Sequence, residues 1–426
     1  MAMNTFSTEL FDEISKIPCV NSHSHIAPEA ERLAEPPDIL SFFKHAYPVS
    51  DLVSAGMSAD EIETALTPGL PIVERWNTFE PYWNYTRLTG YSQCITEGIR
   101  DILGFPDLTA ETVEPISEAI REQCKTGFYH DVLQRKSNIE MTVMNMEDLI
   151  EVDRSLFLPL PRLNRFSMLR SAGQVSAIEE DYDVSITNLD EHVEAIRHAC
   201  RFWKTSKVAG VKMSQSYHRR MDFTQRQKED AAKVFDRMMQ GNYAGLESDD
   251  GVVLEDYLVF ECCRAASDVD LTIQFHQGIR AGNYGSMEGC SPTPLAELMQ
   301  TFRDARFDLS HAGYPYLREG AVLGKTFSNV YLNMSWIHII SPIGSRHDLK
   351  EWLRMVPYNK IIAYGDDLRH VEAVYGHLKM ARQNFAIALA EMIEEGVISE
   401  SVALDIAQAV FHDNPAKIYG LTYSLP

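Results

Sequence analysis

The sequence has few cations for its size. Its 426 residues include 39 lysines and arginines against 61 aspartates and glutamates, which gives a formal net charge of −22. Proteins that bind nucleic acid or anionic membranes need clustered cations on their surface. The charge balance therefore argues against both classes of protein, although a local arginine cluster can still bind a small anionic ligand.

Several other signals are missing. The seven cysteines are an odd number without CxxC spacing, which favours free thiols in a reducing compartment. Residues 1–18 lack the basic and apolar regions of a signal peptide, and the longest apolar helical stretch, 385–393, is too short to span a bilayer. Glycine motifs that bind nucleotides and the GxSxG motif of serine hydrolases are also absent. We therefore expect a cytoplasmic protein that is neither a nucleotide-binding protein nor a serine hydrolase.

A repeating pattern of short apolar runs and helical stretches is present. Such runs are typical of buried parallel strands, and the helices supply the crossovers that these strands require. Eight strand–helix units are the number in a (β/α)8 barrel, so we predict one TIM barrel over residues 1–426. The expected strands lie at residues 17–21, 139–145, 156–160, 207–213, 271–276, 306–311, 329–334 and 360–365. The expected helices lie at 188–203, 254–267, 293–304, 316–327, 346–355, 377–395 and 399–411.

One interval is too long for a single crossover. Residues 28–135 follow the first expected strand, are rich in aromatic residues and contain several helix-like stretches. We interpret this interval as a helical insertion after strand 1. Loops after barrel strands lie at the C-terminal face, where active sites occur, so the insertion is expected to act as a lid or pocket wall. A separate small domain without a role in the site is the alternative.

Chemistry-bearing residues stand at the ends of the expected strands. His23 and His25 follow strand 1 at a spacing that places both imidazoles on one face. His276 ends strand 5, His311 ends strand 6 and Asp366 follows strand 8. Imidazole nitrogen and carboxylate oxygen are preferred ligands of Zn²⁺ and related ions, and buried His and Asp need such a partner. We therefore predict one divalent metal ion, Zn²⁺ with Mn²⁺ as the alternative, at the catalytic face.

These residues carry a resemblance to a known family. The HSH motif and the strand-end His and Asp look like the amidohydrolase superfamily of metal-dependent barrels. The stretches LSHAGYPYLREGAVLGKTFSNVYLNMSW, NKIIAYGDDLRH and DNPAKIYGL look like its amidohydrolase-2 branch, in particular the nodulin-like domains found alone or fused to glutamine synthetase. The resemblance covers 205–422 and 17–27. More distantly, the layout is similar to uronate isomerases and to aminocarboxymuconate semialdehyde decarboxylase.

The resemblance implies roles for individual residues. His23, His25, His276 and Asp366 match the usual ligands of a single metal ion, and Asp366 is preferred to Asp367 because it directly follows IIAYG. His311 matches a histidine that binds a second metal or acts on the substrate. The sequence departs from the family at Asn21-Ser22, because many relatives have an aspartate there, near the HxH motif.

Lys212 occupies the strand-4 position at which dinuclear members carry a carboxylated lysine. Three roles remain open for Lys212: a partner for a substrate carboxylate, a carbamate bridge between two metals, or a structural ion pair. An unmodified lysine is a cation and cannot bind a metal.

The loops at the catalytic face indicate an acidic substrate. Arginine side chains are suited to carboxylate recognition, and Trp336, at the end of strand 7, is a candidate apolar pocket wall. The expected substrate-binding residues are Lys212, Tyr217, Arg219, Arg280, Arg369 and Trp336.

We expect a metal-dependent hydrolase that cleaves a C–N or C–O bond in a small carboxylated substrate. A bound divalent ion lowers the pKa of its water and polarises a carbonyl, with Asp366 moving the water proton and His311 stabilising charge or shuttling a proton. A uronate-isomerase-like or decarboxylase activity is the alternative. A non-catalytic barrel that acts as a binding protein is the second alternative. The expected partner is the small-molecule substrate, and we expect the chain to form a homo-oligomer.

Overall fold

Parallel strands form the centre of the molecule. The computed structural model describes residues 5–246, 248–287 and 289–421. Within these residues, eight strands lie in two parallel sheets with the orders β1-β2-β3 and β4-β5-β6-β7-β8. The strands are β1 (Cys19–Ser24), β2 (Ile139–Met146), β3 (Phe157–Pro161), β4 (Gly210–Met213), β5 (Thr272–Phe275), β6 (Phe307–Leu309), β7 (Val330–Asn333) and β8 (Ile361–Ile362). Each coincides in whole or in part with an expected strand.

Backbone contacts join the two sheets into a barrel. Between β3 and β4, Arg162 and Lys212 form a parallel bridge, and the Ala209 amide donates to the Pro159 carbonyl at 2.8 Å. At the other seam, the Ser22 amide donates to the Tyr364 carbonyl at 3.0 Å. The predicted (β/α)8 barrel is therefore confirmed. Its strands are buried on nearly every residue, as expected for parallel strands that are covered by helices.

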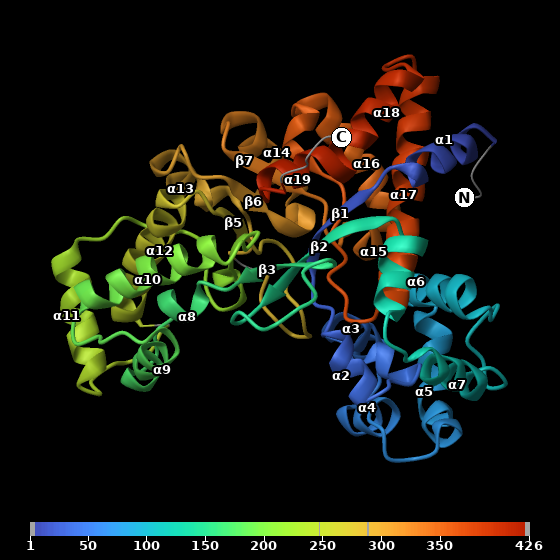
Figure 1. Ribbon diagram of the computed structural model, residues 1–426, viewed down its shortest axis with the longest axis horizontal. Helices are drawn as coiled ribbons and strands as arrows, with labels where there is room; N and C mark the ends of the chain where they lie inside the picture. Colours follow the sequence, from blue (N-terminus) through green and yellow to red (C-terminus); the bar gives the residue numbers. More distant parts are fainter. Residues whose placement is uncertain (1–4, 247, 288, 422–426) are drawn as a thin grey trace.

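Helices cover the barrel, as Figure 1 shows. Sequence-local signals start several of them: the side chains of Asn188 and Ser248 accept hydrogen bonds from backbone amides in the first turns of α10 and α12. The sequence predicts none of the helices α1, α8, α9, α11, α15 and α19. Helix α9 buries only Val175 and Ile178, too few for a clear apolar pattern. The α-helices outside the first crossover are α1 (Thr5–Lys16), α8 (Asn164–Ser167), α9 (Ala172–Tyr182), α10 (Leu189–Thr205), α11 (Lys228–Met239), α12 (Asp249–Asp268), α13 (Ala296–Thr301), α14 (Leu317–Thr326), α15 (Ile337–Ile340), α16 (Pro342–Met355), α17 (Val371–Glu394), α18 (Glu400–Gln408) and α19 (Asn414–Ile418).

The crossover from β1 to β2 consists of helices, which gather beside the barrel as the blue-to-cyan group in Figure 1. They are α2 (Glu29–Ala34), η1 (Leu40–Phe43), α3 (Ala46–Ser54), α4 (Ala59–Leu66), α5 (Ile72–Thr86), α6 (Gly90–Gly98), η2 (Ile99–Leu103), α7 (Val113–Gln123) and η3 (His130–Lys136). A buried ion pair connects them to α17, because Arg32 donates to both carboxylate oxygens of Glu372 at 2.6 and 3.0 Å. We call the segment α2–η3 the insertion.

The C-terminal helices complete the core. The long helix α17 runs alongside the insertion helix α6, and the two form an extensive contact. After α19, the buried Tyr419 places its hydroxyl group inside the barrel, where it donates to Asp308 of β6. The chain therefore closes the barrel end opposite the strand-end histidines. Among the described residues, no helix is both long and apolar enough to cross a membrane.

Candidate metal centre and active site

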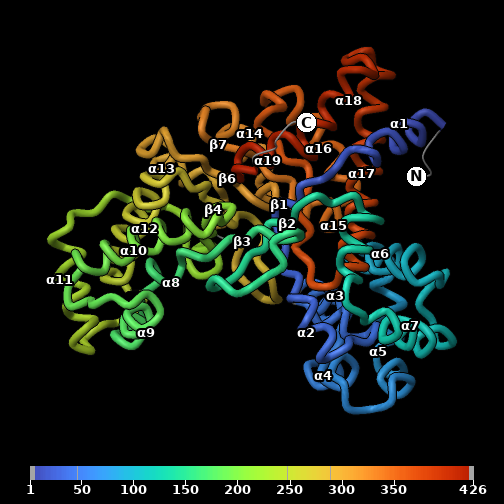
Figure 2. The backbone as a smooth tube through the Cα atoms, viewed as in Figure 1, coloured from blue at the N-terminus to red at the C-terminus, as the bar shows by residue number. Residues whose placement is uncertain are grey.

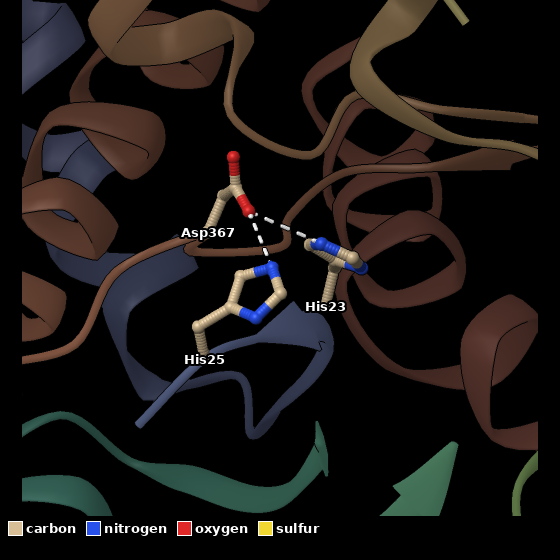
Figure 3. Close-up of side chains that lie close together, drawn as sticks. All are labelled: His23, His25 and Asp367. Atoms are coloured by element: carbon tan, nitrogen blue, oxygen red, sulfur yellow. Dashed lines mark hydrogen bonds and ion pairs between the residues drawn. The ribbon is translucent and has the colours of Figure 1, made fainter. Parts of the chain in front are cut away.

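Two histidines and an aspartate meet where β1 ends. The Nε2 atoms of His23 and His25 lie 3.1 and 3.2 Å from the same carboxylate oxygen, Oδ1 of Asp367 (Figure 3). One ligand-capable atom from each of the three residues lies within 4.8 Å of the other two. His23 and Asp367 are buried, whereas the His25 side chain is 24% exposed. The cluster can therefore be reached from the side of His25.

The polar contacts of His23 test whether the cluster suits a metal ion. Oε1 of Gln274 lies 2.7 Å from Nδ1 of His23 and accepts its proton. Burial, aided by the charge of Lys212, lowers the pKa of His23 to about 3, so the ring is neutral and Nε2 carries a lone pair. This lone pair faces the carboxylate of Asp367. Two acceptors side by side repel one another unless they share a cation, so the donor set fits a divalent metal ion.

The other two strand-end histidines lie beside this cluster. The His311 ring is 4.9 Å from the His23 ring and 4.5 Å from the His276 ring, between centroids. Nε2 of His276 donates to the Ile279 carbonyl at 3.1 Å. Burial lowers the pKa of His276 to about 3 and that of His311 well below its usual value. The structure therefore brings four imidazoles together, with His276 next to His311 rather than beside the Asp367 carboxylate.

His311 has an unusual backbone conformation. Its φ is +65°, in the left-handed region, and its amide donates to Oγ of Ser335 at 2.9 Å. Non-glycine residues adopt this conformation at a cost, and they tend to do so where the conformation aims a side chain at a functional site. The turn after β6 thus directs the His311 ring toward the cluster.

The strand-8 aspartate beside the histidines differs from the expected one. The carboxylate of Asp366 accepts hydrogen bonds from Asn21 and from the Leu368 amide, the latter at 2.7 Å, and it does not join the cluster. Burial raises the pKa of Asp366 to about 8. Asp367 takes the place beside the imidazoles because its φ of +53° turns the chain out of the strand geometry. The choice of Asp366 depended on its position directly after IIAYG, and that position does not reveal the turn that the backbone takes at Asp367.

Lys212 lies inside the barrel, next to Gln274 and Ser310. Its ammonium group donates to Gln274 Oε1 and to Ser310 Oγ, each at 2.9 Å. The residue is 1% exposed, and burial lowers its pKa to about 7. Lys212 therefore contacts two neutral oxygens in the core, and its neighbours are protein groups rather than an open substrate pocket.

The expected substrate-binding residues divide into two groups. Tyr217 packs on His276 with ring centroids 4.5 Å apart, and the buried Trp336 packs on His311 at 5.4 Å. Arg280 is half-buried in the loop after β5. Arg219, in contrast, lies 2.9 Å from the buried Asp256 of α12 and 3.5 Å from Glu255. The guanidinium of Arg219 is thus engaged within the protein.

Arg369 lies two residues after Asp367 and is exposed. It lines a cavity of about 410 Å³ between the insertion and the loop after β8, together with Lys44 and His45. The cavity therefore has a cationic side chain from each of these elements, and Glu31 and Glu35 of the insertion line it as well.

The insertion supplies further side chains that the sequence did not reveal. Tyr47 lies 4.0 Å from Trp336 and 5.7 Å from Tyr91 between ring centroids, which links α3 and α6 of the insertion to the loop after β7. Burial lowers the pKa of His45 to about 4, with Asp367 acting in the opposite direction. These aromatic residues stand in a segment without barrel periodicity, so no pattern marked them in advance.

Comparisons with known proteins place this arrangement in a family. A family model described as Amidohydrolase matches residues 190–421. Among curated proteins, a uronate isomerase from Phenylobacterium zucineum is 22% identical over 97% of this chain and 93% of that protein. Protein fluG from Emericella nidulans is 22% identical over 41% of this chain, and the chain spans about a fifth of that protein.

Solved structures show the same fold. A uronate isomerase from Thermotoga maritima superposes with a TM-score of 0.81 at 17% identity, covering 98% of each chain. A glucuronate isomerase from Caulobacter crescentus gives 0.80 at 16% identity, covering 98% of this chain and 94% of that one. At these identities the likeness concerns the fold. Since the family model covers more than half of the chain, the protein belongs to the amidohydrolase family.

Proposed function

We propose that the protein is a metal-dependent isomerase that interconverts the aldehyde and ketone forms of a small hydroxy acid of the uronate class. The observation that carries this proposal is the likeness to a uronate isomerase over 97% of the chain, which runs through the barrel, the insertion and the site. The hydrolase expected from the sequence has support from the family assignment alone. The whole-chain likeness therefore favours the alternative reaction that the sequence left open.

His23, His25 and Asp367 would hold one divalent ion, Zn²⁺ or Mn²⁺, through two imidazole nitrogens and one carboxylate oxygen. Compared with the ligands expected from the sequence, this set contains Asp367 in place of Asp366, and His276 lies next to the set without belonging to it. When bound, the ion polarises the substrate carbonyl and so acidifies the neighbouring C–H bond. His23 and Asp367, which are buried and held by neighbouring side chains, would provide a rigid position for the ion.

The protein residues would move two protons in the reaction. Oδ1 of Asp367 faces the imidazoles, so Oδ2 is the atom that we assign to take the proton from C2 and return it to C1. His311, neutral at physiological pH and held by Ser335, would pass the hydroxyl proton from O2 to O1. Both carbons then exchange oxidation level within the substrate, and no outside oxidant or reductant is needed.

The substrate carboxylate would bind the cations next to the site. Arg369 is exposed in the cavity shared with the insertion and follows Asp367 by two residues. Arg280, Tyr217 and Trp336 lie in loops that surround His276 and His311 and would form the remaining walls. Arg219 and Lys212 are bonded inside the protein, so we assign them no contact with substrate.

The test is a product assay with D-glucuronate and D-galacturonate. The protein is stripped of metal, reloaded with Zn²⁺ or Mn²⁺, and incubated in D₂O, and the ketose is followed by NMR. We expect ketose formation with solvent deuterium at C1, loss of activity in Asp367→Asn, and little activity on D-glucose, which lacks the carboxylate.

Hydrolysis is the competing result. If lactones or acyl-amino acids acquire ¹⁸O from labelled water while both uronates are left unchanged, the isomerase proposal is wrong and the hydrolase expectation holds.

A further inference from the structure

A continuous chain of buried polar groups runs through the barrel from its closed end to the metal cluster. The Tyr419 hydroxyl donates to Oδ2 of Asp308, and Gln274 Nε2 donates to the same carboxylate oxygen at 2.7 Å. On its other side, Gln274 contacts His23. Gln274 and Asp308 are 0% exposed and Tyr419 is 3% exposed. Gln274 is thus the group through which the core reaches the cluster.

The contacts of Gln274 allow one orientation of its amide. Nε2 lies 3.1 Å from the backbone carbonyl of Ser22, which can only accept a hydrogen bond, so this atom is the donor. Oε1 lies 2.9 Å from the amine of Lys212, which supplies donor hydrogens. A flipped amide would place its NH₂ group against the Lys212 ammonium and its oxygen against the Ser22 carbonyl. Five contacts, including those to Tyr419 and Asp308, therefore fix Oε1 toward His23.

This orientation decides which nitrogen of His23 carries the proton. Because Gln274 Oε1 only accepts, Nδ1 of His23 must donate the hydrogen bond that spans 2.7 Å. The proton is then absent from Nε2, the atom that faces Asp367. A free neutral imidazole can populate both tautomers, and one of them has a hydrogen at the position that a metal must occupy.

We propose that Gln274 is a positioning residue that locks His23 in the Nδ1–H tautomer and fixes the angle of its ring, with Asp308, Tyr419 and Lys212 holding the Gln274 amide in place. The proposal concerns the metal centre proposed above and assigns Lys212 a role in supporting Gln274. Buried outer partners of this kind are known to orient metal-binding histidines, and their loss costs about 10–100-fold in metal affinity.

Two substitutions at residue 274 separate the acceptor from the rest of the side chain. Gln274→Met keeps a similar volume and removes the acceptor, so metal affinity should fall by about 10–100-fold. Gln274→Glu keeps an acceptor toward His23 and can share a proton with Asp308, so affinity should stay near the wild-type value or rise. The dissociation constant for Zn²⁺ is measured by competition with a chromogenic chelator.

The tautomer is measured on the metal-free protein. Selective ¹⁵N-histidine labelling and NMR distinguish protonated from unprotonated ring nitrogens, and the spectrum of His23→Asn identifies the His23 signals. We expect the Nδ1–H form alone in the wild type and in Gln274→Glu, and a mixture of tautomers in Gln274→Met. This measurement tests Gln274 whether or not the protein isomerises uronates.

Matched variants exclude a general loosening of the barrel. Thr272→Val removes a buried hydroxyl from the same strand, where Thr272 donates to the Ile418 carbonyl and accepts from Arg306 at 3.1 Å. Its metal affinity should stay within about twofold of wild type. Tyr419→Phe removes the hydroxyl group at the far end of this series of buried polar groups and should lower metal affinity by less than about tenfold. This result remains available if Gln274→Met does not fold.

An unchanged affinity and a pure Nδ1–H tautomer in Gln274→Met would overturn the proposal. Equal losses in Thr272→Val and Gln274→Met would do so as well, because they would show a structural effect that is not directed at His23. If Gln274→Met fails to fold, a mixture of His23 tautomers in Gln274→Glu would be sufficient to reject the proposed role of Gln274.

Discussion

At the residue scale, two adjacent aspartates occupy opposite environments. Asp366 is hydrogen-bonded by Asn21 and the Leu368 amide, and burial raises its pKa to about 8. Asp367 is also buried, and its Oδ1 atom lies 3.1 and 3.2 Å from the Nε2 atoms of His23 and His25. The two carboxyls are therefore suited to different tasks, Asp366 to a structural contact and Asp367 to binding a cation.

The first prediction compares Asp367→Asn with Asp366→Asn. Asp367→Asn removes a charged ligand and should weaken metal binding by more than the roughly 10–100-fold typical of an outer partner. Asp366→Asn should keep the metal and lose about 1–2 kcal/mol of stability, because at least one of the donors that face the carboxyl group loses its acceptor. Metal content by mass spectrometry and urea unfolding check both outcomes. Loss of metal in Asp366→Asn alone would restore the assignment made from the sequence.

The second prediction concerns Lys212. Its pKa is about 7 in the folded protein and about 10.4 in an unfolded chain, so between these values the unfolded chain binds the extra proton. The contribution of Lys212 to the free energy of unfolding therefore increases with pH above 7, by up to about 1.4 kcal/mol per pH unit.

Lys212→Met removes this contribution. Relative to wild type, the slope of unfolding free energy against pH between 7 and 8.5 should become less positive by up to that amount. Urea unfolding at several pH values measures the slope, with Lys233→Met on the surface of α11 as the control for losing one lysine. An identical slope in Lys212→Met and wild type would contradict the folded pKa.

At the element scale, the insertion is held to the barrel by close helix packing. Gly376 of α17 faces the Cys94 carbonyl of α6, and a Cβ atom at Gly376 would lie 2.0 Å from that oxygen. A Cβ at Gly98 of α6 would lie 2.2 Å from the Glu372 carbonyl. Both distances are too short for any other residue, so the contact depends on glycine. His377 of α17 also donates a hydrogen bond to the Asp366 backbone carbonyl at 3.1 Å, so α17 connects the insertion to the loop after β8.

The third prediction is that Gly376→Ala separates these helices. Overpacking of this kind should cost about 1–3 kcal/mol of unfolding free energy, and more where the backbone cannot shift. Gly173→Ala in α9 is the matched control, since its Cβ meets only Ser171 Oγ at 3.6 Å. Alanine has a higher helix propensity than glycine, so that control should be neutral or more stable by up to about 1 kcal/mol. Equal midpoints in urea for both variants would contradict the close contact.

At the scale of the whole molecule, burial of histidine dominates the response to acid. Burial lowers the pKa of eight histidines: to about 3 for His23, His276 and His370, to about 4 for His45, His192 and His338, and well below the usual value for His311 and His377. An unfolded histidine takes up a proton near pH 6.5. Below that pH the unfolded chain binds more protons, so stability falls as pH decreases from 6.5 toward 4.

The fourth prediction is a loss of stability of the metal-free protein in this range. Aspartates with a raised pKa, such as Asp366 and Asp348, act in the opposite direction and reduce the net effect. His192→Gln, far from the metal cluster, should lower the slope by up to about 1.4 kcal/mol per pH unit. His198→Gln, exposed on the same helix, is the control. A protein as stable at pH 4.5 as at pH 6.5 would contradict this account.

Much of this molecule was determined by the sequence itself. All eight strands were predictable because buried parallel strands are short, apolar and separated by helical crossovers. His23, His25, His276 and His311 were placed near one another because barrel strands deliver their last side chains to one face. Gln274 stands two residues before His276 on the same strand, so its face of the barrel was also predictable, although its role was not.

Only the tertiary structure decided which strand-8 aspartate meets the histidines, because the choice of Asp366 depended on its position after IIAYG, which does not reveal the left-handed backbone at Asp367. The same holds for Tyr47 and Tyr91, which reach the site from helices about 250 residues or more before Trp336 in the chain. It also holds for Arg219, which pairs with a buried carboxylate of α12 instead of facing the site. Local pattern fixes which face of a strand a side chain occupies, whereas contacts between distant segments depend on how the helices pack around the barrel.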